Sequence, residues 1–523
     1  MRRPVVVGPL FLLCSAFLLQ ACGPAEGELP PQPLASSTQA LVLPDRSLAV
    51  TEERILEPFT LQRVMDQIVA TSGVSGVTPV SLFQQWWDTQ NLAPGIGAGP
   101  HCDDETLMGV PALNGYPWEC PRAEGYQAHV DPFRGLPRDH LYMPIGLFNR
   151  FDLAPANGAH CGEYRIVFAM RPGHRDARGR NFLIFEAVLP NPDPARGIGG
   201  CLPVAQFWYD LTSEPDPMVR QRLLFDFYFR GLPGFEPVVH ARHYGTQLTD
   251  GGYGCTTGQI RTNQFVGGEW NLREFRLVND CRCGSCFLVM APTTVKDNPY
   301  GKLFDSSTSH PAAPALQSTV VGAVGSLGTG GVNDLGWSVS NKLNTGESVS
   351  LLGGPYDYLT IFNDGTAIDP TFFDAIDAEI ASVWPGLYHP EQIVTRAQTQ
   401  SCAGCHHTTN SADIGNGFVW PDSLRFVHVE EFVSGGFFPM SDALRHEFLP
   451  HRADLLESFV LSGGTSPPTD TKCEIPVPRE LEVDCQTRAA RDVTLRPFTP
   501  SGLESLTMKS LQRAESLGGA RVH

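Results

Sequence analysis

The sequence has little positive charge. Its 523 residues contain 38 Lys and Arg against 56 Asp and Glu, which gives a formal net charge of −18. Nucleic-acid binding depends on Lys and Arg side chains that neutralise phosphates, so this balance argues against DNA or RNA as a partner. An acidic surface instead favours a well-solvated protein and is compatible with a basic partner.

Long hydrophobic runs and repeats are also missing. Beyond residue 21, no stretch offers the 18 consecutive apolar residues of a membrane-spanning helix. No repeat of solenoid period and no heptad run is present, which excludes repeat arrays and coiled coils. G-x-S-x-G, a P-loop and a G-x-G-x-x-G between strand and helix are absent as well, so serine-hydrolase and nucleotide-binding chemistry have no motif here.

The N-terminus has the pattern of an export signal. Two arginines precede an apolar run from Val5 to Leu19, which is too short to span a bilayer. The run leads into Leu19-Gln-Ala-Cys22, which resembles the lipobox of bacterial lipoproteins and implies a lipid anchor on Cys22. Gly23 is not the Asp that the same resemblance links to inner-membrane retention, so we expect the outer membrane. An ordinary signal peptide with an incidental Cys22 is the alternative.

The mature chain exceeds one ordinary hydrophobic core, and its composition changes along its length. We expect an α+β multidomain protein, with a β-rich body that carries helical insertions and a small all-α module. The expected segments are 1–21 (lipoprotein signal peptide), 22–50 (flexible tether), 51–140 (helical N-terminal segment), 141–370 (β-rich body), 371–465 (all-α module) and 466–523 (C-terminal disulfide loop and tail).

Hydrophobic periodicity predicts the main elements. Apolar residues at helical spacing predict helices over 60–70, 83–87, 217–229, 313–324, 372–383 and 390–400. Short apolar runs bounded by Pro, Gly and Asn predict strands over 164–170, 182–189, 259–266, 270–278 and 287–290. Trp86 and Trp87 are expected to be core aromatics.

Charged and amide residues recur around and within the predicted strands. Because side chains alternate between the two faces of a strand, these residues share a face, which is either a solvated surface or a polar cleft that binds a ligand. We favour the solvated surface. The residues are Asn149, Arg150, Asp152, Glu163, Arg165, Glu186, Arg261, Asn263, Arg273 and Glu274.

Cysteine usage agrees with export. Of 14 cysteines, ten remain after Cys14 in the signal, Cys22 and the two thiols of the motif below, and an even number suits disulfides in an oxidising compartment. Proximity in sequence favours the pairs Cys102–Cys120, Cys161–Cys201 and Cys473–Cys485. Two further disulfides are expected among the last four cysteines, with a metal site or a Cys283–Cys286 redox pair as alternatives. These four are Cys255, Cys281, Cys283 and Cys286.

One motif points to a cofactor. Cys402-Ala-Gly-Cys405-His406, hereafter the pentad, is a C-x-x-C-H sequence of the kind that attaches c-type haem. Its two thiols are spaced to reach the two vinyl groups of one porphyrin, and its histidine can ligate the iron from one face. A disulfide or a zinc-binding C-x-x-C with a neighbouring histidine is the alternative.

Around the pentad the chain resembles a monohaem c-type cytochrome domain. In that family a first helix delivers the pentad, a loop methionine closes the sixth position of the iron, and a last helix packs across the first. The resemblance implies one covalent haem c in 371–465, with Cys402 and Cys405 as anchors, His406 as proximal ligand and Met440 as sixth ligand. The last helix would be 451–461. Alternatives to Met440 are an open site and a histidine among His407, His428, His446 and His451.

The sequence thus predicts an exported lipoprotein that binds haem c and exchanges single electrons with an unidentified redox partner at the cell envelope. The first alternative is a haem-dependent oxidoreductase or peroxidase with an open distal site, although dihaem peroxidases resemble a two-pentad arrangement and this chain has one pentad. The second is a non-enzymatic surface lipoprotein whose pentad is only a disulfide. The remainder of the chain resembles uncharacterised exported bacterial proteins, a resemblance that implies no activity.

Overall fold

The computed structural model describes residues 42–96, 99–174, 179–245, 258–266, 269–280 and 286–468. Ala40–His523 form one compact unit, distinct from Met1–Gln39. The predicted signal peptide, the lipid anchor Cys22, the Cys473–Cys485 pair and nearly all of 466–523 lie outside the described residues, as do Cys255, Cys281 and Cys283. Among the described helices, none has both the length and the apolar character needed to cross a membrane.

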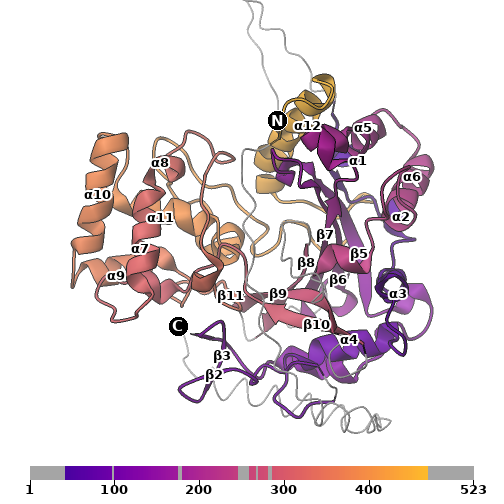
Figure 1. Cartoon of the computed structure of the whole chain (residues 1–523), viewed down its shortest axis with the longest axis horizontal. Helices are drawn as coiled ribbons and strands as arrows, with labels where there is room; N and C mark the ends of the chain where they lie inside the picture. Colours follow the sequence, from indigo (N-terminus) through magenta and orange to yellow (C-terminus); the bar gives the residue numbers. More distant parts are fainter. Residues whose placement is uncertain are drawn as a thin grey trace, which may run out of the picture. The chain divides into compact units, whose positions relative to one another are not determined.

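The body is built on a large antiparallel sheet (Figure 1). Its main strands are neighbours in space in the order of the sequence, as expected where short connections join antiparallel strands. They are β5 (Tyr142–Arg150), β6 (His160–Met170), β7 (Asn181–Pro190), β8 (Gln259–Val266), β9 (Glu269–Asp280) and β10 (Phe287–Thr293). β11 (Ser348–Val349) also pairs with β9. A mixed α+β class with a β-rich body is therefore confirmed.

The fold begins inside the predicted tether. α1 (Pro44–Ser47) and β1 (Ala49–Val50) lie within residues 22–50, and β1 pairs with β5. Val42, Leu48 and Val50 are buried, because these apolar side chains have partners in the body. A flexible tether can therefore extend no further than residue 41, nine residues short of the predicted boundary.

A small second sheet lies early in the chain, formed by β2 (Thr106–Leu107), β3 (Val110–Leu113) and β4 (Tyr116–Pro117). Asn114 and Gly115 join β3 to β4 with φ angles of 58° and 76°, the left-handed pair that a two-residue hairpin turn requires.

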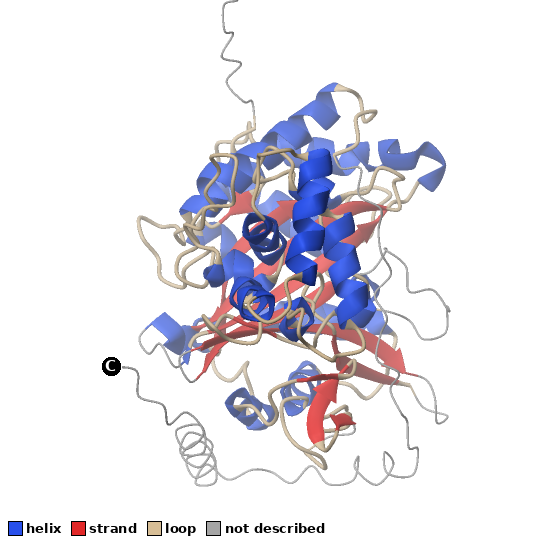
Figure 2. Cartoon of the chain, turned by 90° about the vertical axis from the view of Figure 1, so that its left-hand side faces the viewer, coloured by secondary structure: helices blue, strands red, loops and turns tan. Residues whose placement is uncertain are grey.

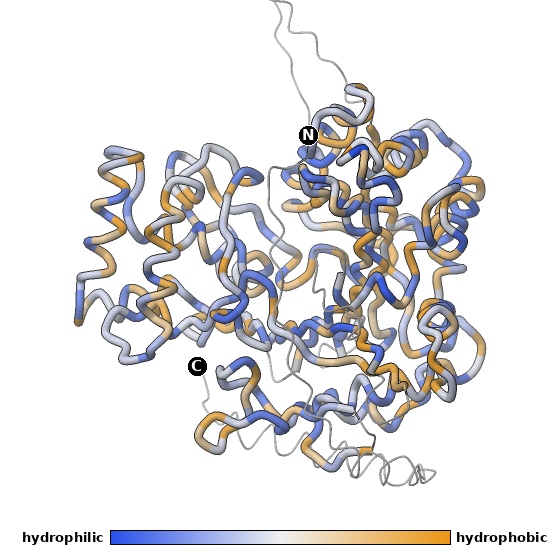
Figure 3. The backbone as a smooth tube through the Cα atoms, in the orientation of Figure 1, coloured by the Kyte–Doolittle hydropathy of each residue, from blue (hydrophilic) through white to orange (hydrophobic). Residues whose placement is uncertain are grey.

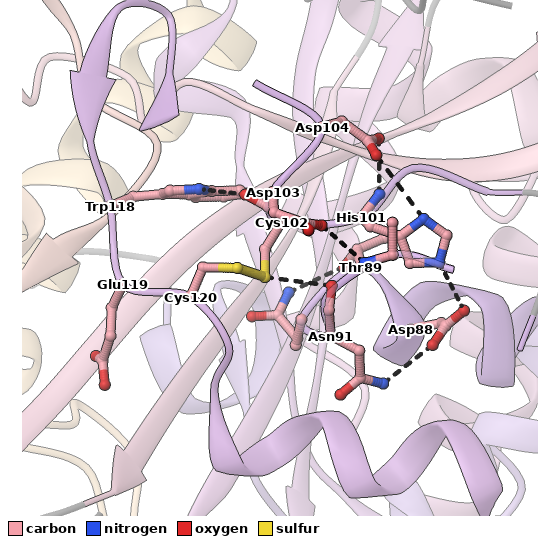
Figure 4. The surroundings of a disulfide bond; sticks show 12 residues. Asp88, Thr89, Asn91, His101, Cys102, Asp103, Asp104, Trp118, Glu119 and Cys120 are labelled. Carbon is pink, nitrogen blue, oxygen red and sulfur yellow. Dashed lines mark hydrogen bonds and ion pairs between the residues drawn. A yellow bond between two sulfur atoms is a disulfide. The ribbon is translucent and has the colours of Figure 1, made fainter. Parts of the chain in front are cut away.

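Two disulfides brace the body. Cys102–Cys120 spans the small sheet, and the Trp118 indole donates a hydrogen bond to the Cys102 carbonyl at 2.8 Å (Figure 4). Cys161–Cys201 ties β6 to the residue before α5 (Leu202–Leu211). Both predicted pairs are confirmed, and Cys286 is disulfide-bonded as well.

One group of helices packs against the large sheet and forms a hydrophobic core with it. It contains α2 (Glu53–Leu56), α3 (Leu61–Ser72), α4 (Pro79–Asp88), α5 and α6 (Pro217–Phe229). Thr60 and Thr78 begin α3 and α4 by accepting hydrogen bonds from the backbone N–H groups of Arg63 and Ser81. Trp86 and Trp87 are fully buried, and Trp86 packs edge-on against Phe185 of β7 and Phe275 of β9. The prediction of core tryptophans is confirmed.

A second group of helices has its own core. α7 (Ala313–Gly322), α8 (Val324–Leu327), α9 (Tyr358–Thr366), α10 (Thr371–Val383) and α11 (Pro390–Thr399) pack together. Figure 2 shows these helices in front of the strands, and in Figure 3 hydrophobic and hydrophilic segments alternate along them, as amphipathic helices require. We call this set the α7–α11 group.

The last described helix, α12 (Leu449–Leu461), packs elsewhere. Leu449, Leu456 and Phe459 join the core of the sheet, α12 contacts α5, and the Phe459 ring lies 4.7 Å from the ring of Phe151. This differs from the arrangement that the cytochrome resemblance implies, in which the last helix crosses α11. The physical reason is that the apolar face of α12 meets its partners on the β-rich body.

His160, the first residue of β6, provides a prediction about acid stability. It is 5% exposed, and burial lowers the pKa of its imidazole from 6.5 to about 4. Between these values the unfolded chain binds more protons than the folded chain, so the free energy of unfolding falls as pH decreases from about 6.5 to 4. This residue alone contributes up to about 3 kcal/mol, fully present above pH 6.5.

Urea unfolding at a series of pH values checks this expectation. The variant His160→Asn retains a side-chain acceptor for the Gly162 N–H, which His160 binds at 3.1 Å, and should unfold with a shallower pH dependence. His446→Asn, at a position whose side chain is 71% exposed, is the matched control and should leave the slope unchanged. Equal slopes in all three proteins would contradict the assignment.

Candidate functional site

The pentad directly follows α11. Pro390 starts this helix, and the side chains of His389 and Gln392 cap it reciprocally. Arg396, fully buried in α11, donates hydrogen bonds to the carbonyl oxygens of Leu327 and Thr329 at 2.8 Å each. These bonds hold α11 to the end of α8 and to the residues that follow it. The position of Cys402 after α11 is therefore fixed.

The pentad itself is one tight helical turn that widens into the π-helix η11 (Gly404–Thr408). The backbone N–H of Ala403 donates to the Ser348 hydroxyl of β11 at 2.9 Å. Since β11 pairs with β9, this bond fastens the pentad to the large sheet.

Gly404 is required for this turn. A Cβ added there would lie 1.8 Å from the carbonyl oxygen of Gln398, far inside van der Waals contact. We expect Gly404→Ala to displace the pentad and to lower the free energy of unfolding by about 1–3 kcal/mol. Gly322→Ala in α7 is the control, because a Cβ there meets nothing within 4 Å, and it should be neutral or slightly stabilising. Chemical denaturation of both variants tests this, and equal losses would refute it.

Cys402 and Cys405 are unpaired, each with part of its surface accessible. Burial among protein atoms raises the pKa of Cys402 to about 12 and that of Cys405 to about 11. The nearby positive charges of Arg452, Arg150 and Arg261 lower the pKa of Cys405, but their effect is smaller than that of burial. Both side chains are therefore neutral thiols at physiological pH.

His406 is oriented by the backbone. Its Nδ1 lies 2.7 Å from the carbonyl oxygen of Phe426, so Nδ1 carries a proton and donates it. The neutral ring then presents the lone pair of Nε2, the tautomer that a metal-ligating histidine needs. Burial lowers the pKa of His406 to about 4, which keeps the ring neutral at physiological pH.

His428 contacts both Cys405 and His406. Its Nε2 is 3.6 Å from the Cys405 Sγ, its ring centroid is 4.8 Å from that of His406, and its Nδ1 is 2.8 Å from the Ser441 hydroxyl. Burial lowers its pKa well below the usual range. His407 points its Nδ1 to the Ser350 carbonyl oxygen at 2.9 Å.

Met440 occupies apolar surroundings. It forms a bridge with Val429 and is 8% exposed within the hydrophobic core that includes Phe438 and Leu444. Its neighbour Ser441 contacts His428. Ligation of iron by Met440 stays a prediction, and among the histidine alternatives His428 contacts Cys405 and His406 of the pentad.

The strand polar residues form a buried charged network rather than a solvated face. Arg165 on β6 bonds Glu163 at 2.9 Å and Glu186 at 3.1 Å, and Arg261 on β8 bonds Glu186 at 3.3 Å and Glu274 at 2.8 Å. Glu186 and Glu274 are 0% and 2% exposed. The preference for a solvated surface was wrong, because the segment that contains the pentad covers this face of the sheet.

This network reaches the pentad. Arg150 bonds Asp152 at 2.8 Å, and Arg452 of α12 lies 3.6 Å from the same carboxylate. The charge of Arg261 lowers the pKa of the Cys402 thiol, whereas the charges of Glu274 and Glu186 raise it. We call the set the charged cluster: Arg150, Asp152, Glu163, Arg165, Glu186, Arg261, Glu274 and Arg452. It balances four positive with four negative groups.

Arg273 and Asn263, predicted to share that face, differ in role. Arg273 is fully buried and donates to Gln90 Oε1 and Glu347 Oε2 at 2.7 Å each, on the side of the small sheet. Asn263 donates to the Phe426 carbonyl at 3.4 Å, the same oxygen that holds His406. Sequence analysis missed Arg452 and Phe426. Phe426 acts through its backbone carbonyl, a group that every residue has, and a single arginine in a helix forms no recognisable motif.

Comparison of the chain with protein-family models, with curated proteins and with solved structures found no match.

Proposed function

We propose that this chain is an exported lipoprotein that carries one covalent c-type haem on the pentad and transfers single electrons at the cell envelope. One observation carries the proposal: two unpaired thiols, Cys402 and Cys405, adjoin a neutral histidine whose Nδ1 is bound to a carbonyl and whose Nε2 is left for a metal. The unpaired thiols also count against the alternative in which the pentad is only a disulfide.

The residues fit such a group chemically. Cys402 and Cys405 would hold the haem by thioether bonds, each thiol giving its hydrogen to the vinyl group to which its sulfur becomes bonded. His406 supplies Nε2 as a ligand, and the Phe426 carbonyl keeps the ring in the required tautomer. A haem bound here supplies an iron that changes its oxidation state by one electron.

A second function, a haem-dependent oxidoreductase or peroxidase, is favoured by one observation. The charged cluster places four arginines and four carboxylates in buried or half-buried positions near the pentad, and burying so many charges is costly where they serve only packing. Charged groups of this kind bind and orient polar substrates. The redox partner in either case is unidentified, and the acidic chain is compatible with a basic one.

The test is made on chain produced together with cytochrome c maturation machinery. We expect a haem absorbance band that stays with the denatured chain and a mass increase equal to one porphyrin, both lost in a Cys402→Ala/Cys405→Ala variant. A chain that is lighter by two hydrogens at this peptide would instead show a disulfide and refute the proposal. Carbon monoxide binding to the reduced protein indicates an open iron site and favours the oxidoreductase, whereas its absence favours electron transfer.

The lipid anchor has its own test. Cys22 is proposed as the acylated residue, with the outer membrane as the site of attachment. Cys22→Ser should move the chain from the membrane to the soluble fraction, because stable attachment depends on the acyl chains. Haem attachment should be unaffected, which separates failure of the anchor from failure of the pentad.

A further inference from the structure

A second group of ligand-type side chains lies between α6 and β8, apart from the pentad. Glu236, His240 and His243 each bring one ligand atom to within 4.8 Å of the others. The segment is firmly held: the N–H of Val239 donates to the Tyr228 carbonyl at 2.9 Å, and the N–H of Ala241 donates to the Thr71 hydroxyl at 2.9 Å. The three side chains therefore converge from a fixed backbone.

His243 has an unusual pair of contacts. Its side chain is fully buried, with Nδ1 3.1 Å from the Val238 carbonyl oxygen and Nε2 3.2 Å from Glu236 Oε2. Both neighbours are hydrogen-bond acceptors, and a neutral imidazole has one N–H to donate. One of the two contacts thus needs either a further proton, on the ring or on the carboxyl group, or a cation beside Nε2.

The two other members complete a donor set that is open to solvent. His240 is half-buried, and its ring centroid is 5.2 Å from that of His243. The Glu236 side chain is 37% exposed. Contacts with Arg242 and His243 both use Glu236 Oε2, which leaves Oε1 outside them. An ion can therefore approach from the exposed side.

Two features oppose a metal and set its affinity. The Arg242 guanidinium bonds Glu236 Oε2 at 2.7 Å and competes with a cation for this carboxylate. The backbone N–H of Arg242 donates to His240 Nδ1 at 3.3 Å, a weak bond that His240 gives up if it changes tautomer to ligate through Nε2. Both costs are small beside the binding energy of three transition-metal ligands.

We propose that Glu236, His240 and His243 bind a divalent first-row transition metal ion, for which Zn²⁺ is the probe. Two imidazoles and one carboxylate are a donor set that Zn²⁺ accepts, and three protein ligands leave a fourth position for water or a substrate. This site is independent of haem at the pentad.

The experiment measures Zn²⁺ binding to the full chain. The Cys402→Ala/Cys405→Ala background is used because the free pentad supplies a competing set of thiols and imidazole. We expect one Zn²⁺ per chain with micromolar or tighter affinity in competition with a chromophoric chelator. Glu236→Gln and His240→Ala, at partly exposed positions that do not endanger folding, should each weaken binding by at least about tenfold.

Two further readouts identify the ligands. Co²⁺ bound in place of Zn²⁺ should show d–d bands without thiolate charge transfer, as expected for nitrogen and oxygen donors. Arg242→Gln removes the competing cation and should tighten binding. No Zn²⁺ uptake below the millimolar range would mean that His243 is held by a proton alone. That result would overturn the inference. So would a Zn²⁺ affinity that neither Glu236→Gln nor His240→Ala changes.

Discussion

Replacing His406 with alanine is expected to abolish the c-type haem spectrum, whereas replacing His407 with alanine should preserve it. The two residues are adjacent, both are half-buried, and each points Nδ1 to a backbone carbonyl, of Phe426 at 2.7 Å and of Ser350 at 2.9 Å. Loss of either side chain therefore costs a similar hydrogen bond. His406 alone directly follows Cys405, so it alone has the place of the proximal ligand.

The measurement is the haem content and reduced spectrum of each variant, made alongside the unsubstituted chain. Haem content should fall at least about tenfold in His406→Ala and remain nearly unchanged in His407→Ala, because removal of a ligand acts on the metal directly. Similar losses in both variants would show that the histidines act through local folding instead. Full haem content with an unaltered spectrum in His406→Ala would exclude this residue as a ligand.

The same spectra decide the sixth ligand. Met440→Ala alters the spectrum and lowers the potential if Met440 ligates the iron, since Met/His ligation raises the potential. His428→Ala alters the spectrum instead if His428, which contacts Cys405 and His406, is the ligand. An open site is indicated if neither substitution changes the spectrum.

Removing Glu186 is expected to cause a large loss of stability. This carboxylate is fully buried on β7 and bonds both Arg165 at 3.1 Å and Arg261 at 3.3 Å. Glu186→Ala removes one of the two carboxylate partners of Arg165 and of Arg261, which keep Glu163 and Glu274. The buried cluster is then left with one uncompensated positive charge, and we expect a loss of about 3–5 kcal/mol in the free energy of unfolding.

Glu430→Ala is the matched control for this loss. Glu430 pairs with Arg180 at 3.0 Å, and Arg180 keeps Glu431 as a partner at 2.5 Å, but unlike Glu186 the Glu430 side chain is partly exposed, at 18%, so that water solvates the site when it is removed. The expected loss is below about 1 kcal/mol. Urea denaturation of both variants at neutral pH makes the comparison, and a small loss in Glu186→Ala would mean that solvent screens the charged cluster.

Local sequence predicted much of the secondary structure. β8 (Gln259–Val266) and α6 (Pro217–Phe229) have the predicted bounds, because alternation and a proline in the first turn are local signals. α5 (Leu202–Leu211) was missed, since apolar residues on most of its positions hide the helical period. β5 was missed as well, because it carries Pro144 and a register shift between Pro144 and Gly146.

Sequence by itself determined the pentad, the acidic charge, the export pattern and the two disulfides between near neighbours, because each depends on residue identity and short spacing. Tertiary structure decided everything that depends on which surface covers another. The strand charges are buried beneath the pentad segment, and α12 packs on the body instead of on α11. The His406 tautomer is set by a carbonyl group 20 residues away in the sequence. Glu236, His240 and His243 are brought together only by the fold. A one-dimensional pattern records the two faces of a strand or helix, but the partner of each face is selected by the packing of the whole chain.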